Sequence, residues 1–348
     1  MRLPLRLLLA SLPLLVPSAW AAPVTDLFEV REAVESQQPQ ARDAALARAL
    51  DTLVLRLTGS TEALGSPAVN ELRKDPQQIV RQYGYEDGRL LVEFDPLSTE
   101  RSLRQAGLPL WGANRPAILV WWLNEGIEGS SLIGDGQAAA TPLRQAGQHR
   151  GLPLRLPLAD LAEQLLANPE NLGADQPKAL QGASERYAAD ALLAVQAAES
   201  DGQWQAQWRL WLGESREQGK AQGADQAALA DAIMLAVSQR LAPRFIVAPS
   251  AASQLTLEVQ GSDLGRYAEL QRLLEPFAAQ LLKVEGDRLT FALKASAEQL
   301  RAQLALGRLV EVSGEAPVDA GATLVEGEEQ AEEAPRIVPR DNVLRFRW

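Results

Sequence analysis

The stretch 117-AILVWWL-123 is a continuous run of apolar residues. Its length suits a strand, and a strand that is apolar on both faces lies in the centre of a sheet with both faces covered. Apolar residues at helical spacing precede it, over residues 39–58, and follow it, over residues 224–241. Because such helices need a sheet to pack on, the run predicts a mixed α/β fold around a buried strand.

A hairpin is predicted farther along the chain. Residues 189–198 and 203–212 flank Asp201-Gly202, a dipeptide typical of tight hairpin turns. In the second of these strands, Trp204 and Trp208 share one face with apolar residues, and glutamines occupy the other face. This alternation predicts an inner face that packs on helices, and an aromatic platform for a glycan is the alternative.

Residues 254–312 predict a small third domain. Strand-like and helix-like stretches follow each other there in the order strand, helix, strand, strand, helix, strand. This is the βαββαβ pattern of ferredoxin-like folds. The whole chain is therefore predicted as a multi-domain α/β (α+β) protein with mixed sheets and packed helices.

The composition excludes several kinds of site. The 348 residues include 34 Lys and Arg, 45 Asp and Glu, one His and no Cys, and the net charge is −11. Disulfides, thiolate zinc sites and cysteine nucleophiles are excluded, and so is any metal site with two His ligands. The negative charge disfavours broad binding to nucleic acid. We expect no cofactor, no metal and no nucleic-acid partner.

The first 21 residues have the pattern of a secretory signal peptide. Arg2 and Arg6 flank the start of an apolar run over residues 3–16, and Ala19-Trp20-Ala21 fits a cleavage site. The run is short for a membrane span and contains prolines, and the lack of Cys excludes a lipidated N-terminus. We therefore expect a cleaved, soluble exported protein without an integral membrane segment, which in a Gram-negative bacterium is periplasmic.

Composition shifts divide the remainder of the chain. The predicted parts are an N-terminal α/β domain (22–112), a central mixed α/β domain (113–250), the ferredoxin-like domain (254–312), a disordered acidic linker (313–335) and a basic-aromatic terminal strand (336–348).

The terminal strand is the most unusual of these parts. Leu344, Phe346 and Trp348 alternate with arginines, as in a half-buried strand, and the segment before them carries acids without Lys or Arg. An alternating strand with a free carboxylate on an acidic tether suits β-strand addition to a partner, or carboxylate capture. The alternative is that the strand packs back on the protein's own sheet.

Sequence motifs of common enzyme classes are missing. The chain has no phosphate-binding loop with a Gly-Lys pair, no H-E-x-x-H and no G-x-S-x-G. A Ser-His-Asp triad would require His149, which is better interpreted as a surface residue at the end of a helix. Paired carboxylates such as Glu199 and Glu214 are interpreted as solvated charges at strand ends. No catalytic residue is therefore predicted.

Four groups of motifs resemble the domain of unknown function 2066 family of exported proteobacterial envelope proteins. They are 41-ARDAALARALDTLVLRLTG-59 with the strand before it, 150-RGLPLRLPLAD-160, 183-ASERYAAD-190 and the hairpin over residues 202–211. The resemblance covers most of the chain up to about residue 312. It implies an envelope protein and no particular activity.

Some of these motif residues are candidates for binding. Gly151 fits a left-handed helix cap, and Asp160 fits the first turn of the next helix. Arg186 is expected to pair with Asp160 or Asp190. The predicted binding residues are Arg150, Asp160, Arg186, Tyr187, Leu344, Phe346 and Trp348.

These observations favour one class of function. We expect a non-enzymatic interaction or accessory protein of the cell envelope, whose partner is another envelope protein. The alternative is an envelope hydrolase or a glycan- or peptidoglycan-binding module that uses the Gly-rich segment 126–136.

Overall fold

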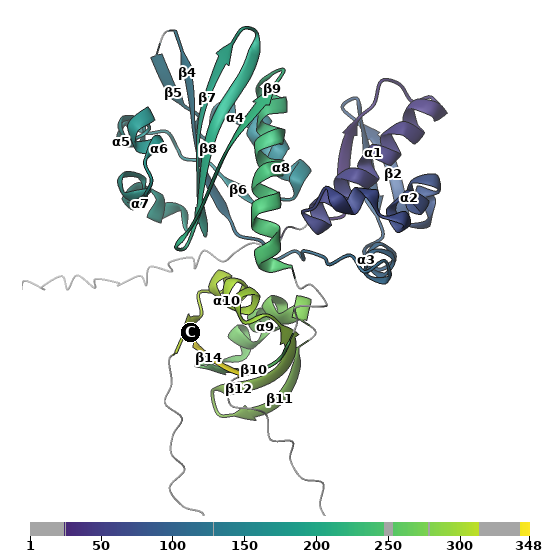
Figure 1. The fold of residues 1–348 in the computed structure, drawn as a ribbon, viewed down its shortest axis with the longest axis vertical. Coiled ribbons are helices and arrows are strands. Elements are labelled where there is room, and N and C mark those ends of the chain that lie inside the picture. Colours follow the sequence, from purple (N-terminus) through teal and green to yellow (C-terminus); the bar gives the residue numbers. More distant parts are fainter. Residues whose placement is uncertain (1–23, 25, 128, 247–252, 278, 313–341) are drawn as a thin grey trace, which may run out of the picture.

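The computed structural model describes residues 24, 26–127, 129–246, 253–277, 279–312 and 342–348 (Figure 1). The predicted signal peptide and the predicted acidic linker lie outside these ranges. Within them, the strands form three sheets, of three, six and five strands, and helices pack on the sheets. The predicted mixed α/β fold class is thus confirmed. None of the helices in the described ranges combines the length and apolar character that a membrane span requires.

The first sheet is antiparallel and carries one long helix. Its strands lie in the order β1 (Glu29–Ala33), β3 (Arg89–Phe94) and β2 (Val80–Glu86). The helices of this unit are α1 (Pro39–Thr58), α2 (Pro67–Lys74) and α3 (Pro96–Gln105). The apolar stripe of α1 is buried on the sheet, and the helix ends at Gly59 with φ +61°. A Cβ at Gly59 would lie 2.1 Å from the Cβ of Ala242, so the end of α1 lies directly against the central unit.

The central sheet is built around the predicted buried strand. Its path is β5 (Gly129–Leu132), β4 (Ile118–Gly126), β7 (Ala191–Ser200), β8 (Gln203–Leu212) and β9 (Ser215–Gly223), and β6 (Leu154–Arg155) also pairs with β4. All apolar side chains from Ala117 to Leu123 are at most 2% exposed. One face packs on α4 (Ala140–Arg150) and α8 (Gln226–Phe245). The other face packs on α5 (Leu161–Leu166), α6 (Pro169–Gly173) and α7 (Lys178–Ser184).

Two strands of this sheet were not predicted. The Gly-rich segment 126–136, predicted as a loop, contains β5. Strand β9 has no apolar alternation because its glycines make room for neighbours. A Cβ at Gly219 would lie 2.5 Å from the Trp208 ring, and one at Gly223 would lie 2.3 Å from the main chain of α8.

The tryptophans of the hairpin belong to the core. The β7–β8 turn is Asp201-Gly202, with positive φ at both residues. Trp208 is 2% exposed and lies in the core cluster with residues of α8. The packing interpretation is therefore confirmed for this face, and the aromatic platform for a glycan is wrong.

The third unit has the predicted βαββαβ order with one additional strand. In chain order its elements are β10 (Ser253–Gln260), α9 (Leu264–Leu274), β11 (Gln280–Glu285), β12 (Arg288–Ala295), α10 (Ala297–Leu306), β13 (Val310–Glu311) and β14 (Val343–Arg347). The sheet order is β11-β12-β10-β14-β13. The terminal strand thus pairs within its own chain's sheet. This agrees with the alternative prediction, in which the strand packs back on the protein's own sheet.

The third unit packs below the end of α8 (Figure 1). The Asn114 side-chain amide donates to the main-chain oxygen of Arg272 in α9 at 2.6 Å. Buried residues of the central and third units form one continuous apolar cluster. The two units are therefore joined by core packing and not only by the chain.

Candidate functional site

The predicted binding residues lie in three separate places. Arg150 lies at the junction of the first and central units, the cluster of Asp160, Arg186 and Tyr187 lies beside α5, and Leu344, Phe346 and Trp348 lie in the third sheet.

At the junction, Arg56 of α1 joins two units through main-chain oxygens. Its guanidinium donates to the carbonyls of Leu27 and Glu29 at 2.8 and 2.7 Å in its own unit. It also donates to the carbonyls of Gln148 and His149 at 3.0 and 3.2 Å, at the C-terminal end of α4. Burial, and then the nearby Arg150, lower the pKa of Arg56 to about 10. The side chain therefore stays charged at neutral pH and satisfies the carbonyl-rich helix end.

Arg115, in the segment between the two units, makes a second set of such bonds. It donates to the carbonyls of Arg56 at 2.6 Å, Trp111 at 3.1 Å and Gly151 at 3.0 Å, and it lies 4.3 Å from the Trp111 ring centroid. Its side chain is fully buried, and burial lowers its pKa. The C-terminal ends of α1 and α4 thus meet at two buried guanidinium groups.

Gly151 fits this junction in two ways. It caps α4 with φ +65°, as predicted. A Cβ there would also lie 2.6 Å from Cγ of Arg56 and 3.0 Å from Nη1 of Arg115. Only glycine meets both requirements without a shift of the two arginines.

His149 lies between two carboxylates from different units. Its Nδ1 is 2.7 Å from Asp231 of α8, and its Nε2 is 3.1 Å from Glu32 of β1. Arg150 also donates to Asp231, through Nε at 2.9 Å and through Nη2. Thr52 Oγ1 donates to Glu32 at 2.7 Å and lies 3.2 Å from Nε2 of His149. His149 lies in the last turn of α4, as predicted, but it is a partly buried residue with partners on both sides and not a free surface residue, which local sequence could not show because these partners come from distant parts of the chain.

The pKa shifts in this group favour the charged forms. Burial alone would lower the pKa of His149, but the hydrogen bonds with Asp231 and Glu32 outweigh it and raise the pKa. Burial alone would raise the pKa of Glu32 and Asp231, and the bonds with His149 reverse that effect, so both are lowered. An imidazolium held by two carboxylates is a poor general base, and Thr52 is only 6% exposed. The arrangement of Asp231, His149 and Thr52 therefore does not match the chemistry of a nucleophilic triad.

A cavity of about 550 Å³ opens beside this junction, between the β2–β3 hairpin and α4. Groups of both signs line it, and several are paired, such as Arg31 with Glu29 at 2.5 Å and Arg144 with Asp135 at 2.8 Å. This lining selects neither an anion nor a cation. Within the described residues, no group of three or more His, Asp or Glu side chains is arranged to hold a metal ion.

The second place is a polar cluster at α5. Asp160 caps the helix by accepting from the Glu163 N–H at 3.0 Å, and this bond, followed by that from Arg186 at 2.7 Å, lowers the pKa of Asp160. Arg186 and the Tyr187 hydroxyl both donate to the Glu163 carboxylate, the latter at 2.5 Å. The Tyr187 hydroxyl also accepts from the Leu158 N–H at 2.8 Å. The predicted Arg186–Asp160 pair is confirmed, whereas Asp190 instead accepts from the Ala117 N–H at 2.8 Å.

This polar cluster supports an exposed apolar surface. Leu158, Leu161 and Leu165 are 65%, 73% and 72% exposed. Leu161 and Leu165 are four residues apart and lie on the same face of α5. We call these three leucines the α5 surface. Glu163, whose side chain is 1% exposed, lies between them on the buried face of the helix.

The third place is β14 in the third sheet. Phe346 is 3% exposed in the core, and Leu344 and Trp348 pack partly against it. Arg345 pairs with Glu258 of β10 at 3.0 Å, and Arg266 lies 5.5 Å from the Trp348 ring centroid. The half-buried alternation predicted for this strand is confirmed.

Three members of these sites carry no recognisable signal in the sequence. Glu32, Glu163 and Asp231 are ordinary acids within amphipathic or strand-like patterns. The i,i+3 spacing of Asp160 and Glu163 at a helix start could have indicated a cap, but not the buried pairing of Glu163 with Tyr187.

A family model matches the first unit of the chain. It is described as a domain of unknown function (DUF8605) and matches residues 21–112, about a quarter of the chain, which hold the first sheet and its helices. This match supports an uncharacterised domain at that position, and it is not the domain of unknown function 2066 that the motifs suggested. No curated protein matches the chain.

Proposed function

We propose that the protein is an exported, non-enzymatic interaction protein of the cell envelope, whose partner binds the α5 surface. Export is supported by the signal-like pattern of residues 1–21. The interaction role rests on the α5 surface, where large apolar side chains are exposed beside a hydrogen-bonded polar cluster. Exposed apolar groups of this kind are typical of binding sites.

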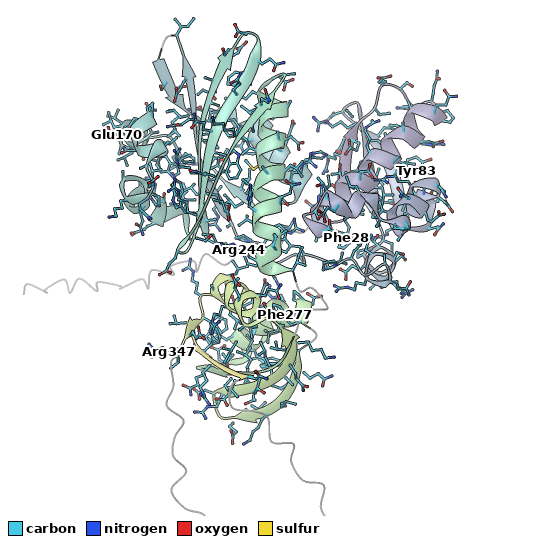
Figure 2. All side chains as sticks on the ribbon, viewed as in Figure 1. Phe28, Tyr83, Glu170, Arg244, Phe277 and Arg347 are labelled. Carbon is cyan, nitrogen blue, oxygen red and sulfur yellow. The ribbon has the colours of Figure 1, made fainter. Side chains whose placement is uncertain are left out.

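The charges around the α5 surface indicate the chemistry of the partner. Glu170 at the start of α6 is exposed, and Figure 2 places it on the outer side of the same group of helices. Glu185, next to Arg186 in the chain, is also exposed. Asp160 and Arg186 already pair with each other. We therefore expect a protein partner with an apolar centre and Lys or Arg at its rim, because opposite charges steer association.

The junction supports the non-enzymatic part of the proposal. The charged groups with shifted pKa values there are bonded to one another across the two units. This arrangement suits a joint that holds two units together.

Site-specific photocrosslinking in cells tests the proposal. A photoreactive residue at Leu165 is expected to give one specific protein adduct, and Leu161→Glu is expected to abolish it. The matched control is Leu97 of α3, which is 75% exposed and lies on another unit. An equal adduct at Leu97, or an adduct that survives Leu161→Glu, would contradict the role of the α5 surface. N-terminal sequencing of the periplasmic fraction tests export, with cleavage expected after Ala21.

A second candidate function is binding of a glycan. The sheet face that carries α5 to α7 also contains a hollow of about 470 Å³ lined by polar side chains of β4, β7, β8 and β9, among them Glu125, Gln196, Gln207 and Lys220. Amide side chains in such a hollow suit sugar hydroxyls. Pelleting with purified peptidoglycan that is lost in Gln207→Leu would favour this function over the first.

A further inference from the structure

Strand β14 interrupts a ferredoxin-like sheet. In a βαββαβ fold the fourth strand ordinarily lies beside the first, which here would place β13 beside β10. Instead β14 lies between them, parallel to β10 from Thr256↔Val343 to Gln260↔Arg347 and antiparallel to β13. The gap between β10 and β13 is therefore one strand wide and offers main-chain donors and acceptors on both sides. We call it the strand slot.

The chain reaches the strand slot through a connection far longer than the geometry requires. The Val312 N–H donates to the Arg345 carbonyl at 2.8 Å, so the two ends of the connection are neighbours. Antiparallel neighbours can be joined by two residues, but residues 313–341 separate these strands. Chain continuity therefore does not impose the pairing, and β14 occupies the slot in the manner of a tethered ligand.

The contacts of β14 define what the strand slot accepts. Phe346 enters the core, and Leu344 and Trp348, two residues away on either side, pack partly against it. Arg345, which lies between Leu344 and Phe346 in the strand, forms an ion pair with Glu258. The slot thus selects an extended peptide with apolar side chains at alternate positions and a basic residue between two of them.

Strand β14 leaves some of its side chains incompletely buried and one polar group unpaired in the strand slot. Val343, Leu344 and Arg345 remain only partly buried. The Nε1 group of Trp348 is buried and has no hydrogen-bond partner among the described residues. A buried unpaired donor weakens binding by about 10-fold. A peptide that avoids this loss would compete well against β14.

We infer that the strand slot is a binding site for such an extended peptide from another protein, and that β14 is the tethered occupant which this peptide replaces. Strand β14 of a second copy of the protein would have no advantage as a ligand. At micromolar protein concentration it competes with an identical strand whose tether gives it an effective concentration of about 1 mM at the slot. This inference rests on the third sheet and is independent of the α5 surface.

The first experiment uses the full chain and a labelled peptide of residues 342–348. The double substitution Leu344→Asp with Phe346→Asp undocks β14 and opens the slot. We expect this variant to bind the peptide with a Kd of about 10 μM in fluorescence anisotropy, and the unsubstituted chain to bind about 100-fold more weakly. The matched control is Leu282→Asp on β11, at the far edge of the sheet, where Leu282 is 59% exposed, and it is expected to bind as weakly as the unsubstituted chain. Equal binding by all three proteins, or no binding by the double variant with intact circular dichroism, would overturn the inference.

A second variant keeps the native packing. The chain has no Cys, so Thr256→Cys with Val343→Cys places one pair of thiols on neighbouring strands that can lock β14 in place. Peptide display on the reduced form is expected to enrich sequences with alternate apolar residues and a basic residue between them, and the oxidised form is expected to enrich none of them. The inference would be overturned if both forms enriched the same sequences, or if the reduced form enriched none. It would also be overturned if the reduced protein formed a dimer that disappears on oxidation, because the slot would then bind β14 of a second copy.

Discussion

The junction at Arg56 and the strand slot at β14 both close a gap between parts of the chain that are distant in sequence, but they do so differently. At the junction, two buried guanidinium groups satisfy the carbonyl ends of α1 and α4, and their donors have several partners each. In the slot, a five-residue strand enters with one fully buried side chain, Phe346.

This difference indicates which part of the molecule can open. Breaking the junction separates buried charged groups from the main-chain carbonyls that they bind, which is costly. Undocking β14 exposes Phe346, the packed parts of Leu344 and Trp348, and the edges of β10 and β13, which water can pair. We therefore expect the junction to persist until global unfolding and the strand slot to open on its own.

The largest effect is expected from breaking the junction. Arg56→Met is expected to lower the free energy of unfolding by about 3–5 kcal/mol, because it removes a buried guanidinium that donates to carbonyls of both units. Arg48→Met, on the same helix, removes a side chain that is 52% exposed and is expected to cost less than about 1 kcal/mol. Urea unfolding measures both. Similar losses in the two variants would show that Arg56 does not hold the units together.

A smaller loss with a distinctive pattern is expected at β14. Phe346→Ala is expected to cost about 3 kcal/mol. Once the strand is undocked, further changes in it no longer matter, so adding Leu344→Ala is expected to cost less than about 0.5 kcal/mol more. Unfolding of the single and double variants tests this. Full additivity would mean that β14 is an integral strand and not a displaceable one.

The glycine cap of α4 gives an intermediate test of the junction. Gly151→Ala is expected to cost about 2 kcal/mol, because it adds a clash with Arg56 to the strain of a positive φ. Gly202→Ala is the matched control, with φ +73° and nothing within 4 Å of the added Cβ, and about 1 kcal/mol is expected there. Equal melting temperatures of the two variants would contradict the close approach at the junction.

The smallest effect concerns pH. The pKa of His149 is raised from its ordinary 6.5, so the stability that it contributes is present below pH 6.5 and is lost as pH rises through the raised value. The pKa values of Glu32 and Asp231 are lowered from 4.5 and 3.8, so their contribution is lost as pH falls below these values. The stability difference between the native chain and His149→Gln is thus expected to be largest near pH 5.5 and about 1 kcal/mol smaller at high pH. A difference that is independent of pH would contradict the charged network.

The same contrast explains what the sequence could predict. The 117–123 strand, the Asp201-Gly202 hairpin and the βαββαβ order follow from local periodicity and turn residues, and the structure confirms them. The alternation in 344–348 predicted a half-buried strand, but the same pattern suits its own sheet or another protein's. Its place between β10 and β13 depends on tertiary pairing that periodicity does not encode.

The sites were predictable only where the partners are close in sequence. Asp160 and Arg186 are 26 residues apart, and their pair was anticipated as one of two alternatives. His149 was misjudged because Glu32 comes from the first unit and Asp231 lies 82 residues farther along the chain, and β9 was missed because Gly219 lies under Trp208 where a strand usually carries an apolar residue.

Native-state hydrogen exchange with peptide-level mass spectrometry tests the central contrast most directly. We expect the amides of β14 and of its neighbour β10 to exchange through a local opening whose free energy is lower than that of global unfolding. We also expect the Trp111 amide, which donates to Leu57 at 2.6 Å in the junction, to exchange only with global unfolding. The contrary result would be the same free energy of exchange for β14 and for the Trp111 amide, with both values rising together under conditions that stabilise the whole protein.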